Sequence, residues 1–282
     1  MPSNDAVARE LAELRATIRH HEERYYVLHD PEISDTEFDR LLARLTSLEA
    51  EHPELVTPDS PTQRVAGRPV DGFESVEHTV PMLSLDNAYD EADLVAWDER
   101  VRKGLDLDED THVDYVAELK IDGLSIAVHY RDGLLAQGIT RGDGVRGEDV
   151  TSNVRAVRGI PLSLRPSAPP VVEVRGEIFL PRSSFDRVNA ERAAADESPF
   201  ANPRNAAAGT MRTLDAALVA SRGLGAYLYQ LVEPEALPGE ADAGHAAVLE
   251  TLATWGLPVD RHWRQCRGSE AVVAYCREWG DA

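Results

Sequence analysis

The chain has 282 residues, of which 43% are hydrophobic, and its 50 acidic against 29 basic residues give a formal net charge of −21. This length is enough for one large domain or for two unequal ones with a sizeable buried core. The polar, acidic N-terminus and the lack of an apolar run of about 18 residues exclude the membrane-spanning and secreted classes, so we expect a cytoplasmic protein without a membrane partner.

Lysine is nearly absent from this chain: Lys103 and Lys120 are the only two, and the remaining basic residues are arginines. An acidic protein almost free of lysine is typical of adaptation to molar salt, where the Debye length falls to about 3 Å and like charges are screened. A GC-rich genome would explain the arginines but not the acidity, so we expect a halophilic source. The scarcity of lysine also marks Lys120 as a candidate functional residue.

Neither the cysteines nor the histidines show the spacing of a metal site. Cys266 and Cys276 lack both paired zinc-site spacing and the density of a disulfide scaffold, so we expect two ordinary thiols. The histidines, His20, His21 and His245 among them, are assigned no role, and no metal-binding residue is predicted.

The N-terminal part is predicted to form two helices. Residues 5–28 carry apolar side chains at helical spacing, and Pro31 closes the stretch. A second helix begins after Ser34, which is predicted to form a capping box with Glu37. The apolar faces of the two helices consist of Val7, Leu11, Leu14, Ile18, Leu41, Leu42, Leu45 and Leu48. The proline-bearing loop HPELVTPDSPTQRVAGRP follows this helical module.

From about residue 73 onward the pattern changes to strands separated by glycine turns. The segment YVAELKIDGLSIAVHYRDGLLAQGITRG predicts strand, Asp-Gly turn and strand, and PPVVEVRGEIFLP predicts another strand. Helices are predicted at residues 90–104, 148–158, 183–195 and 245–256. We therefore expect an α+β fold, with a helical module and linker over residues 1–70 and a domain of mainly antiparallel strands over residues 71–282.

One predicted strand, within AELKIDGLSIAVHY, carries unexpected charges. Residues of one parity share a face of a strand, so Glu118, Lys120 and Asp122 are expected to point the same way. A solvent-facing edge strand would explain these charges equally well. However, VEVRGEIFL repeats the alternation with Glu173, Arg175 and Glu177, and Arg141 follows at a Gly-rich turn. Converging charges of this kind favour a nucleotide-binding cleft.

Four segments resemble the adenylation domain of NAD-dependent DNA ligases: ELKIDG at 118–123, TRGDGVRGEDVTSNVRAVRGIP at 140–161, EVRGEIFLP at 173–181 and FANPRNAAAGTMR at 200–212. In the helical part, YYVLHDPEISDTEFDRL and HPELVTPDSPTQRV resemble the N-terminal domain peculiar to that class, and VPMLSLDNAY resembles its connecting segment. KxDG alone would also fit ATP-dependent ligases and capping enzymes, but the helical module argues against both. The resemblance implies that the domain of strands is a nucleotidyltransferase core.

The resemblance also implies a chemistry. Lys120 would attack the adenylyl phosphorus of NAD, release nicotinamide mononucleotide and become lysyl-AMP, with Mg²⁺ as the cofactor. Asp122 resembles the acid that acts when the AMP passes to DNA, although by itself it is explained as an ion-pair partner of Lys120 or Arg141. The remaining nucleotide contacts implied are Glu118 at the adenine edge, Glu177 at a ribose hydroxyl, and Arg141, Ser84 and Leu85 near the adenosine.

In the helical module the resemblance implies a site for the nicotinamide half of NAD, formed by Tyr25, Tyr26, Asp35, Phe38 and Asp39. Aromatic faces and carboxylates suit the cationic nicotinamide ring, although acids at a helix start are also explained by the helix dipole alone. Phe38 stands where the family usually has tyrosine, so stacking without a hydroxyl is expected there.

Two arginines, Arg204 and Arg212, resemble residues that hold the phosphate of the leaving nucleotide or of nicked DNA; taken alone, they would be read as surface residues.

The sequence ends in YCREWGDA, before the DGVVVK-type strand and second lysine motif of the family, so we expect a ligase truncated at its C-terminal end. NAD and, through the full-length enzyme, nicked double-stranded DNA are the expected partners. The alternative is a catalytically impaired NAD-binding fragment or interaction module. A pure nucleic-acid-binding module is disfavoured by the acidity.

Overall fold

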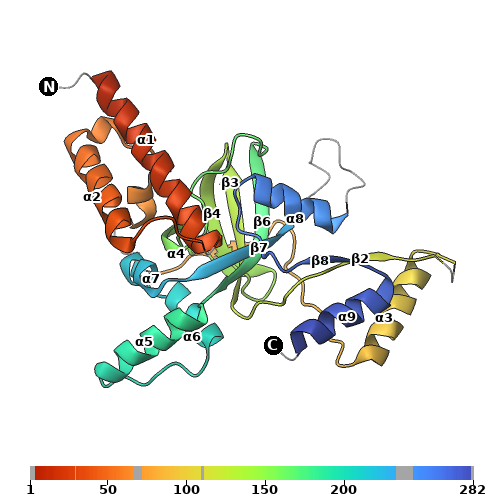
Figure 1. The fold of residues 1–282 in the computed structure, drawn as a ribbon. Coiled ribbons are helices and arrows are strands. Elements are labelled where there is room, and N and C mark those ends of the chain that lie inside the picture. Colours follow the sequence, from red (N-terminus) through yellow and green to blue (C-terminus); the bar gives the residue numbers. More distant parts are fainter. Residues whose placement is uncertain (1–3, 29, 66–71, 109–110, 233–243, 281–282) are drawn as a thin grey trace.

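The computed structural model describes residues 4–28, 30–65, 72–108, 111–232 and 244–280. A pair of helices lies at one end, a four-stranded sheet with its helices in the middle, and a small sheet with two helices at the other end (Figure 1). This arrangement confirms the predicted α+β class, in which a helical module precedes a core of antiparallel strands.

The helical module forms as predicted. Helix α1 (Asn4–Glu22) continues into a π-helical turn (Glu23–Val27), and α2 (Asp35–Glu51) follows. The predicted capping box is present, because the Ser34 hydroxyl accepts from the backbone N–H of Glu37 and the Glu37 side chain accepts from that of Ser34. The two apolar stripes pack on each other, with Val7, Leu11, Ile18, Leu45 and Leu48 buried.

Two short 3₁₀ turns, Pro53–Leu55 and Pro61–Val65, lead out of this module. A buried ion pair between Arg15 and Glu49, at 2.6 Å, joins α1 to α2. The Ser60 hydroxyl donates to the same carboxylate at 2.7 Å, so the chain leaving the module is held against both helices.

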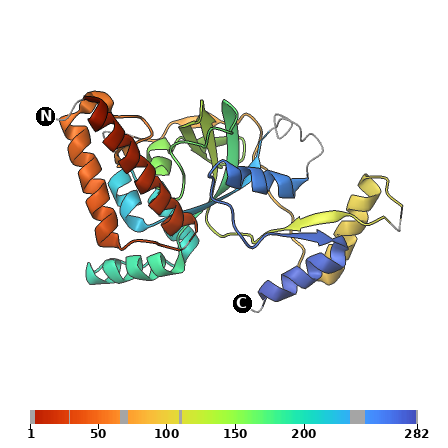
Figure 2. The ribbon, with the colours of Figure 1, turned by 45° about the horizontal axis from the view of Figure 1, so that its top comes forward.

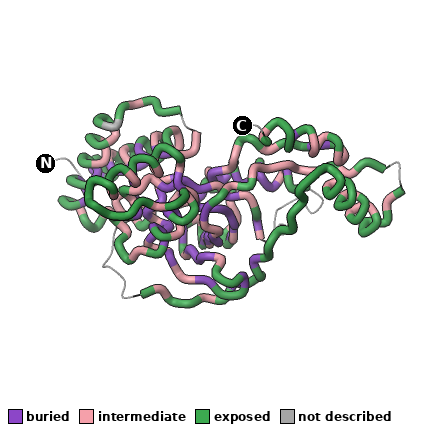
Figure 3. The backbone as a smooth tube through the Cα atoms, turned by 90° about the horizontal axis from the view of Figure 1, so that it is seen from below, coloured by how far each residue is buried: buried purple, intermediate pink, exposed green. Residues whose placement is uncertain are grey.

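The main sheet is antiparallel with strand order β4-β3-β6-β7. Its strands are β3 (Leu124–Arg131), β4 (Leu134–Thr140), β6 (Val171–Phe179) and β7 (Gly225–Leu231). The predicted Asp-Gly turn joins β3 to β4: Asp132 and Gly133 have φ of 50° and 75°, which a two-residue hairpin of this type requires. Buried residues concentrate in this central part of the molecule (Figure 3).

The helices around the sheet match the prediction in part. Those predicted near 90–104, 183–195 and 245–256 are α3 (Glu91–Gly104), α5 (Arg182–Ala194) and α8 (His245–Thr254), and α4 (Thr151–Ala156) is shorter than expected. Three helices were missed: α6 (Pro203–Met211), α7 (Ala216–Arg222) and α9 (Gly268–Gly280). Residues of α4, α6 and α7 contribute to the core beneath the main sheet, with Val154, Ala206, Ala207, Met211 and Val219 buried there.

A separate two-stranded sheet pairs β2 (Asp114–Ala117) with β8 (Arg264–Arg267), and α3 and α9 pack beside it, away from the main sheet (Figure 2). Another short pair, β1 (Ser75–Glu77) with β5 (Arg146–Glu148), lies next to β4. Cys266 is buried, Cys276 is exposed and both are free thiols, as predicted. No helix in the described ranges is long and apolar enough to cross a bilayer.

The prediction that Glu118, Lys120 and Asp122 share the face of one strand is wrong. Strand β2 ends at Ala117 and β3 begins at Leu124, and residues 118–123 cross between the two sheets without belonging to either. The crossing passes close to β6: a Cβ at Gly123 would lie 2.1 Å from the carbonyl oxygen of Ile178. The backbone therefore leaves the small sheet and enters the main one at a position that only glycine accommodates.

Candidate nucleotide-binding site

The crossing that carries Lys120 lies beside Glu177 of β6. The Glu177 carboxylate accepts from the backbone N–H of Gly123 at 3.1 Å and from the Ser125 hydroxyl at 2.8 Å. Burial raises the pKa of Glu177, against the opposing effects of these two hydrogen bonds and of the nearby positive charges of Lys120 and Arg204. The structure thus brings together Lys120 and Glu177, which the sequence predicted for one site.

Arg204 lies at the start of α6, where Asn202 caps the helix by accepting from the backbone N–H of Asn205 at 2.7 Å. Its guanidinium is 3.5 Å from the Asp122 carboxylate, and the two side chains are 60% and 67% exposed. Arg212 lies just beyond the other end of this nine-residue helix, about 12 Å along its axis, and pairs with Glu148 at 3.4 Å. The two predicted arginines therefore occupy different places, and only Arg204 contacts the crossing.

A second group of predicted residues gathers around Arg141, which follows β4. Arg141 donates from Nη2 to the Ser84 hydroxyl at 2.8 Å, and its backbone N–H donates to Ser125 at 3.0 Å. Leu85, predicted beside Ser84, has a side chain that is 78% exposed. The hydrogen bond thus joins Ser84 to Arg141, and the Leu85 side chain is left uncovered.

Glu118 has a partner that the sequence did not indicate. His245, the first residue of α8, lies with Nε2 2.6 Å from the Glu118 carboxylate. Tyr229 of β7 is a second missed residue: its pKa is raised to about 12, first by burial and then by the negative charges of Glu177 and Glu118. Tyr229 therefore lies within electrostatic reach of both carboxylates. Only its alternation with Tyr227 in GAYLYQL could have drawn attention to it.

The other two charges of β6 have a structural place. Arg175 is buried, forms an ion pair with Glu173 at 2.9 Å, and donates to the backbone carbonyls of Pro81, at 3.1 Å, and Val80. These bonds hold the segment that leads to Ser84 against the sheet. The expectation that all three side chains line an open cleft therefore does not hold for Glu173 and Arg175, and Glu177 is itself buried against the crossing.

In the helical module a cavity of about 280 Å³ is lined by His21, Tyr25, Tyr26, Pro31, Glu32, Ile33, Phe38, Asp39 and Arg158. Four of the five residues predicted there, namely Tyr25, Tyr26, Phe38 and Asp39, share this one cavity. The fifth, Asp35, begins α2, and its side chain lies outside the described part of the structure. The rings of Tyr25 and Tyr26 lie 4.7 Å apart, centroid to centroid, and give the cavity an aromatic wall.

The cavity also contains a cation that the sequence did not single out. Arg158, from the segment after α4, donates to the Tyr26 hydroxyl at 3.1 Å, and its guanidinium is 5.7 Å and 5.6 Å from the ring centroids of Tyr26 and Phe38. Burial raises the pKa of Tyr26, although Arg158 opposes that effect. Arg158 belongs to the part of the chain after residue 70, so both parts build the cavity.

A buried arginine fastens the module beside this cavity. Arg64 forms an ion pair with Glu22 of α1 at 2.8 Å. The same guanidinium donates to the backbone carbonyls of Arg155 at 3.1 Å and Ile160 at 3.0 Å, in and after α4. On the surface, Arg165 pairs with Glu23 at 2.9 Å. The position of Arg158 against the aromatic wall is therefore supported by a network that spans the same junction.

Two known family models match this chain, and together they cover nearly all of it. Residues 4–66 match the family model described as the DNA ligase-like, N-terminal NAD+-binding domain, and residues 70–282 match the one described as the NAD-dependent DNA ligase adenylation domain. The DNA ligase of Thermotoga neapolitana is 51% identical over 275 residues, covering 97% of this chain and 38% of that protein. Those of Alkalilimnicola ehrlichii and Pseudomonas putida are 52% and 51% identical, with 94% and 95% of this chain and 38% and 34% of theirs covered. The chain thus spans well under half the length of these relatives.

Proposed function

Because this chain belongs to the NAD-dependent DNA ligase family, we propose that it performs the first step of ligation, the transfer of AMP from NAD to Lys120. The observation that carries the proposal is the position of Lys120 on the crossing beside Glu177, within one chain that also holds the aromatic cavity. The unprotonated amine attacks the adenylyl phosphorus and a P–N bond forms. The pyrophosphate P–O bond breaks, its electron pair leaves with nicotinamide mononucleotide, and the amine releases a proton to solvent.

We assign the adenosine half of NAD to the site around β6. Glu177, held by Gly123 and Ser125, is placed to accept from a ribose hydroxyl, and Glu118 from the amino group at the adenine edge. The aromatic face of Tyr229 suits stacking on a base. Arg141, Ser84 and Leu85 complete this half.

We assign the nicotinamide half to the cavity of the helical module. Tyr25, Tyr26 and Phe38 offer aromatic faces to the cationic ring, and Asp39 offers compensating charge. Asp35 is included in this assignment on its sequence resemblance alone. A mononucleotide also carries a phosphate, and the guanidinium of Arg158 supplies the charge that a phosphate requires. Because Arg158 comes from the part after residue 70, the proposed domain boundary near residue 70 is supported by the change from helices to strands and not by this cavity.

Asp122 and Arg204 are proposed to act after the first step, when AMP passes to the 5′-phosphate of nicked DNA, and Arg212 to contact a phosphate nearby.

Mg²⁺ prefers oxygen ligands and usually binds one or two carboxylates together with substrate phosphates. Asp122, an exposed carboxylate beside the crossing, fits that requirement; when bound, the ion would neutralise charge on the phosphates. Sealing of nicks in replication and repair, in the cytoplasm of a halophile, is proposed for the whole protein; the acidity and lysine scarcity support the last point.

The test is the intact mass of the protein after incubation with NAD and Mg²⁺ in buffer rich in potassium chloride. We expect a gain of one AMP in the wild type and in Lys103→Ala, and none in Lys120→Ala. Lys103, on α3, is the other lysine and so the matched control. No gain in the wild type, with NAD binding retained, would leave an NAD-binding fragment without first-step activity.

A further inference from the structure

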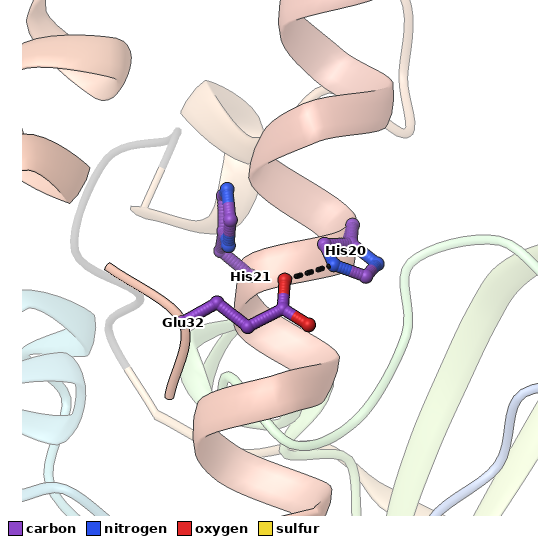
Figure 4. A group of neighbouring side chains, drawn as sticks. All are labelled: His20, His21 and Glu32. Carbon is purple, nitrogen blue, oxygen red and sulfur yellow. Dashed lines mark hydrogen bonds and ion pairs between the residues drawn. The ribbon is translucent and has the colours of Figure 1, made fainter. Parts of the chain in front are cut away.

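Three potential metal ligands meet where α1 ends. His20 and His21 lie in its last turn, and Glu32 lies in the segment that leads to α2. One nitrogen of each histidine and one carboxylate oxygen of Glu32 all lie within 4.8 Å of one another, and His20 Nε2 is 2.7 Å from Glu32 Oε2 (Figure 4). These two histidines show no metal-ligand spacing in the sequence, because the set is completed only where the turn of the chain returns Glu32 to them.

Two further observations indicate a built site rather than a chance meeting. His21 Nδ1 is buried and has no hydrogen-bond partner among the described residues, and a buried unpartnered polar atom of this kind requires an explanation. Arg24 pairs through Nε with the other oxygen of Glu32, Oε1, at 3.0 Å, which holds Oε2 toward His20.

We propose that His20, His21 and Glu32 form a binding site for a divalent transition-metal ion, with Zn²⁺ as the best match. Imidazole nitrogen and carboxylate oxygen are zinc ligands, and three protein ligands plus a water complete its tetrahedron. Mg²⁺, which takes oxygen ligands alone, does not suit two imidazoles.

The geometry needs only a small adjustment. Zinc bonds of about 2.0–2.2 Å place tetrahedral ligand atoms about 3.4 Å apart. The His20 side chain is 53% exposed and can move to that spacing from Glu32, which Arg24 holds in place. The ligand atom of His21 already lies within 4.8 Å of the other two. The ion replaces the direct contact between His20 and Glu32.

Occupancy of this site would affect the nearby cavity, because His21 and Glu32 also line it. A doubly charged ion at the cavity wall opposes a cationic nicotinamide ring, so Zn²⁺ is expected to weaken binding of nicotinamide mononucleotide. This linkage, unlike the metal site itself, rests on the function proposed above.

The experiment is a calorimetric titration of Zn²⁺ into protein that carries no polyhistidine tag, with Mg²⁺ as the comparison ion. We expect His21→Gln and Glu32→Gln each to weaken Zn²⁺ binding at least tenfold and Mg²⁺ to give no binding at these residues. The matched control is His52→Gln, which removes another histidine beside a glutamate, since His52 Nδ1 is 3.5 Å from Glu54. It should bind Zn²⁺ like the wild type. Equal affinities of wild type, His21→Gln and Glu32→Gln would overturn the site.

Substitution of Co²⁺ for Zn²⁺ gives a second readout, because a tetrahedral site shows strong visible absorption. We expect that absorption in the wild type and in His52→Gln and its loss in His21→Gln, with circular dichroism unchanged. Absorption that persists in His21→Gln contradicts the proposed ligand set.

The linkage is measured with His20→Gln, because His20 does not line the cavity. In the wild type, Zn²⁺ should lower the affinity for nicotinamide mononucleotide, and in His20→Gln the affinity should stay the same with and without Zn²⁺. Failure of the nucleotide to bind at all would overturn the proposed function while leaving the Zn²⁺ titration intact. Failure of the Zn²⁺ titration alone would overturn the metal site only.

Discussion

The guanidinium of Arg158 donates to the Tyr26 hydroxyl at 3.1 Å, across the junction between the two parts of the chain. The helical module contributes the aromatic wall of the cavity, and the core contributes a fixed positive charge. A cavity divided in this way is complete only while the module is docked against the core as it is here.

Arg158→Ala is expected to weaken binding of nicotinamide mononucleotide about tenfold to a hundredfold, because a hydrogen bond to a charged group contributes about 1.5–3 kcal/mol. Isothermal titration of nicotinamide mononucleotide into the purified protein measures this change in affinity. Arg165→Ala removes an exposed arginine from the same junction that does not line the cavity, so the affinity should change by less than about fivefold, the limit set by a surface ion pair of at most about 1 kcal/mol. Equal effects of the two substitutions would show that Arg158 contributes only to docking.

The buried pair of Arg64 and Glu22 should be important for stability. Arg64→Ala leaves the Glu22 carboxylate buried without its partner, and breaking a buried pair in this way costs about 3–5 kcal/mol. Urea unfolding monitored by circular dichroism measures the free energy of unfolding. The control is Arg44→Ala, which breaks an exposed ion pair with Glu10 and should cost less than about 1 kcal/mol. A small loss for Arg64→Ala would mean that the junction contributes little to folding.

Arg175→Met tests how the segment before Ser84 is positioned. Methionine fills the buried space but cannot donate to Val80 and Pro81 or pair with Glu173, so we expect a loss of about 3–5 kcal/mol in the free energy of unfolding and slower gain of AMP. Arg131→Met, at the exposed end of β3, should change stability by less than about 0.5 kcal/mol and leave the AMP gain unchanged. AMP gain at the wild-type rate in folded Arg175→Met would contradict the positioning role.

Stability should depend on pH through Glu177. Burial raises its pKa in the folded state above the ordinary value of 4.5, so the folded protein holds this proton more tightly than the unfolded chain. Ionising Glu177 costs free energy in the folded state. This destabilisation is absent below pH 4.5, grows as the pH rises toward the raised pKa, and is complete above the raised pKa. The free energy of unfolding of the wild type, relative to Glu177→Gln, should therefore fall as the pH is raised from below 4.5 toward neutrality.

For that measurement the matched control is Glu250→Gln, which changes an exposed glutamate in the middle of α8. This control measures how far the removal of an exposed glutamate alone changes the free energy of unfolding over the same pH range. A constant difference for Glu177→Gln would mean that this carboxyl is not destabilised in the folded protein.

The elements that were predicted correctly from the sequence are those whose signals lie within a short stretch of chain. The capping box of Ser34 and Glu37 and the apolar stripe around Leu11 depend on residues within a few turns of each other, and the helices formed as predicted. The place of Lys120 depends on β2 pairing with the distant β8, a partner that strand parity does not reveal. Arg158 and the group of His20, His21 and Glu32 likewise become visible only when separate segments meet.

The crossing at residues 118–123 has a mechanical consequence. It joins a small sheet, flanked by α3 and α9, to the four-stranded sheet that carries Glu177. Lys120 therefore lies on a connection between two separately formed sheets. The distance between its amine and Glu177 consequently depends on the angle between the two sheets as well as on the side-chain rotamer of Lys120.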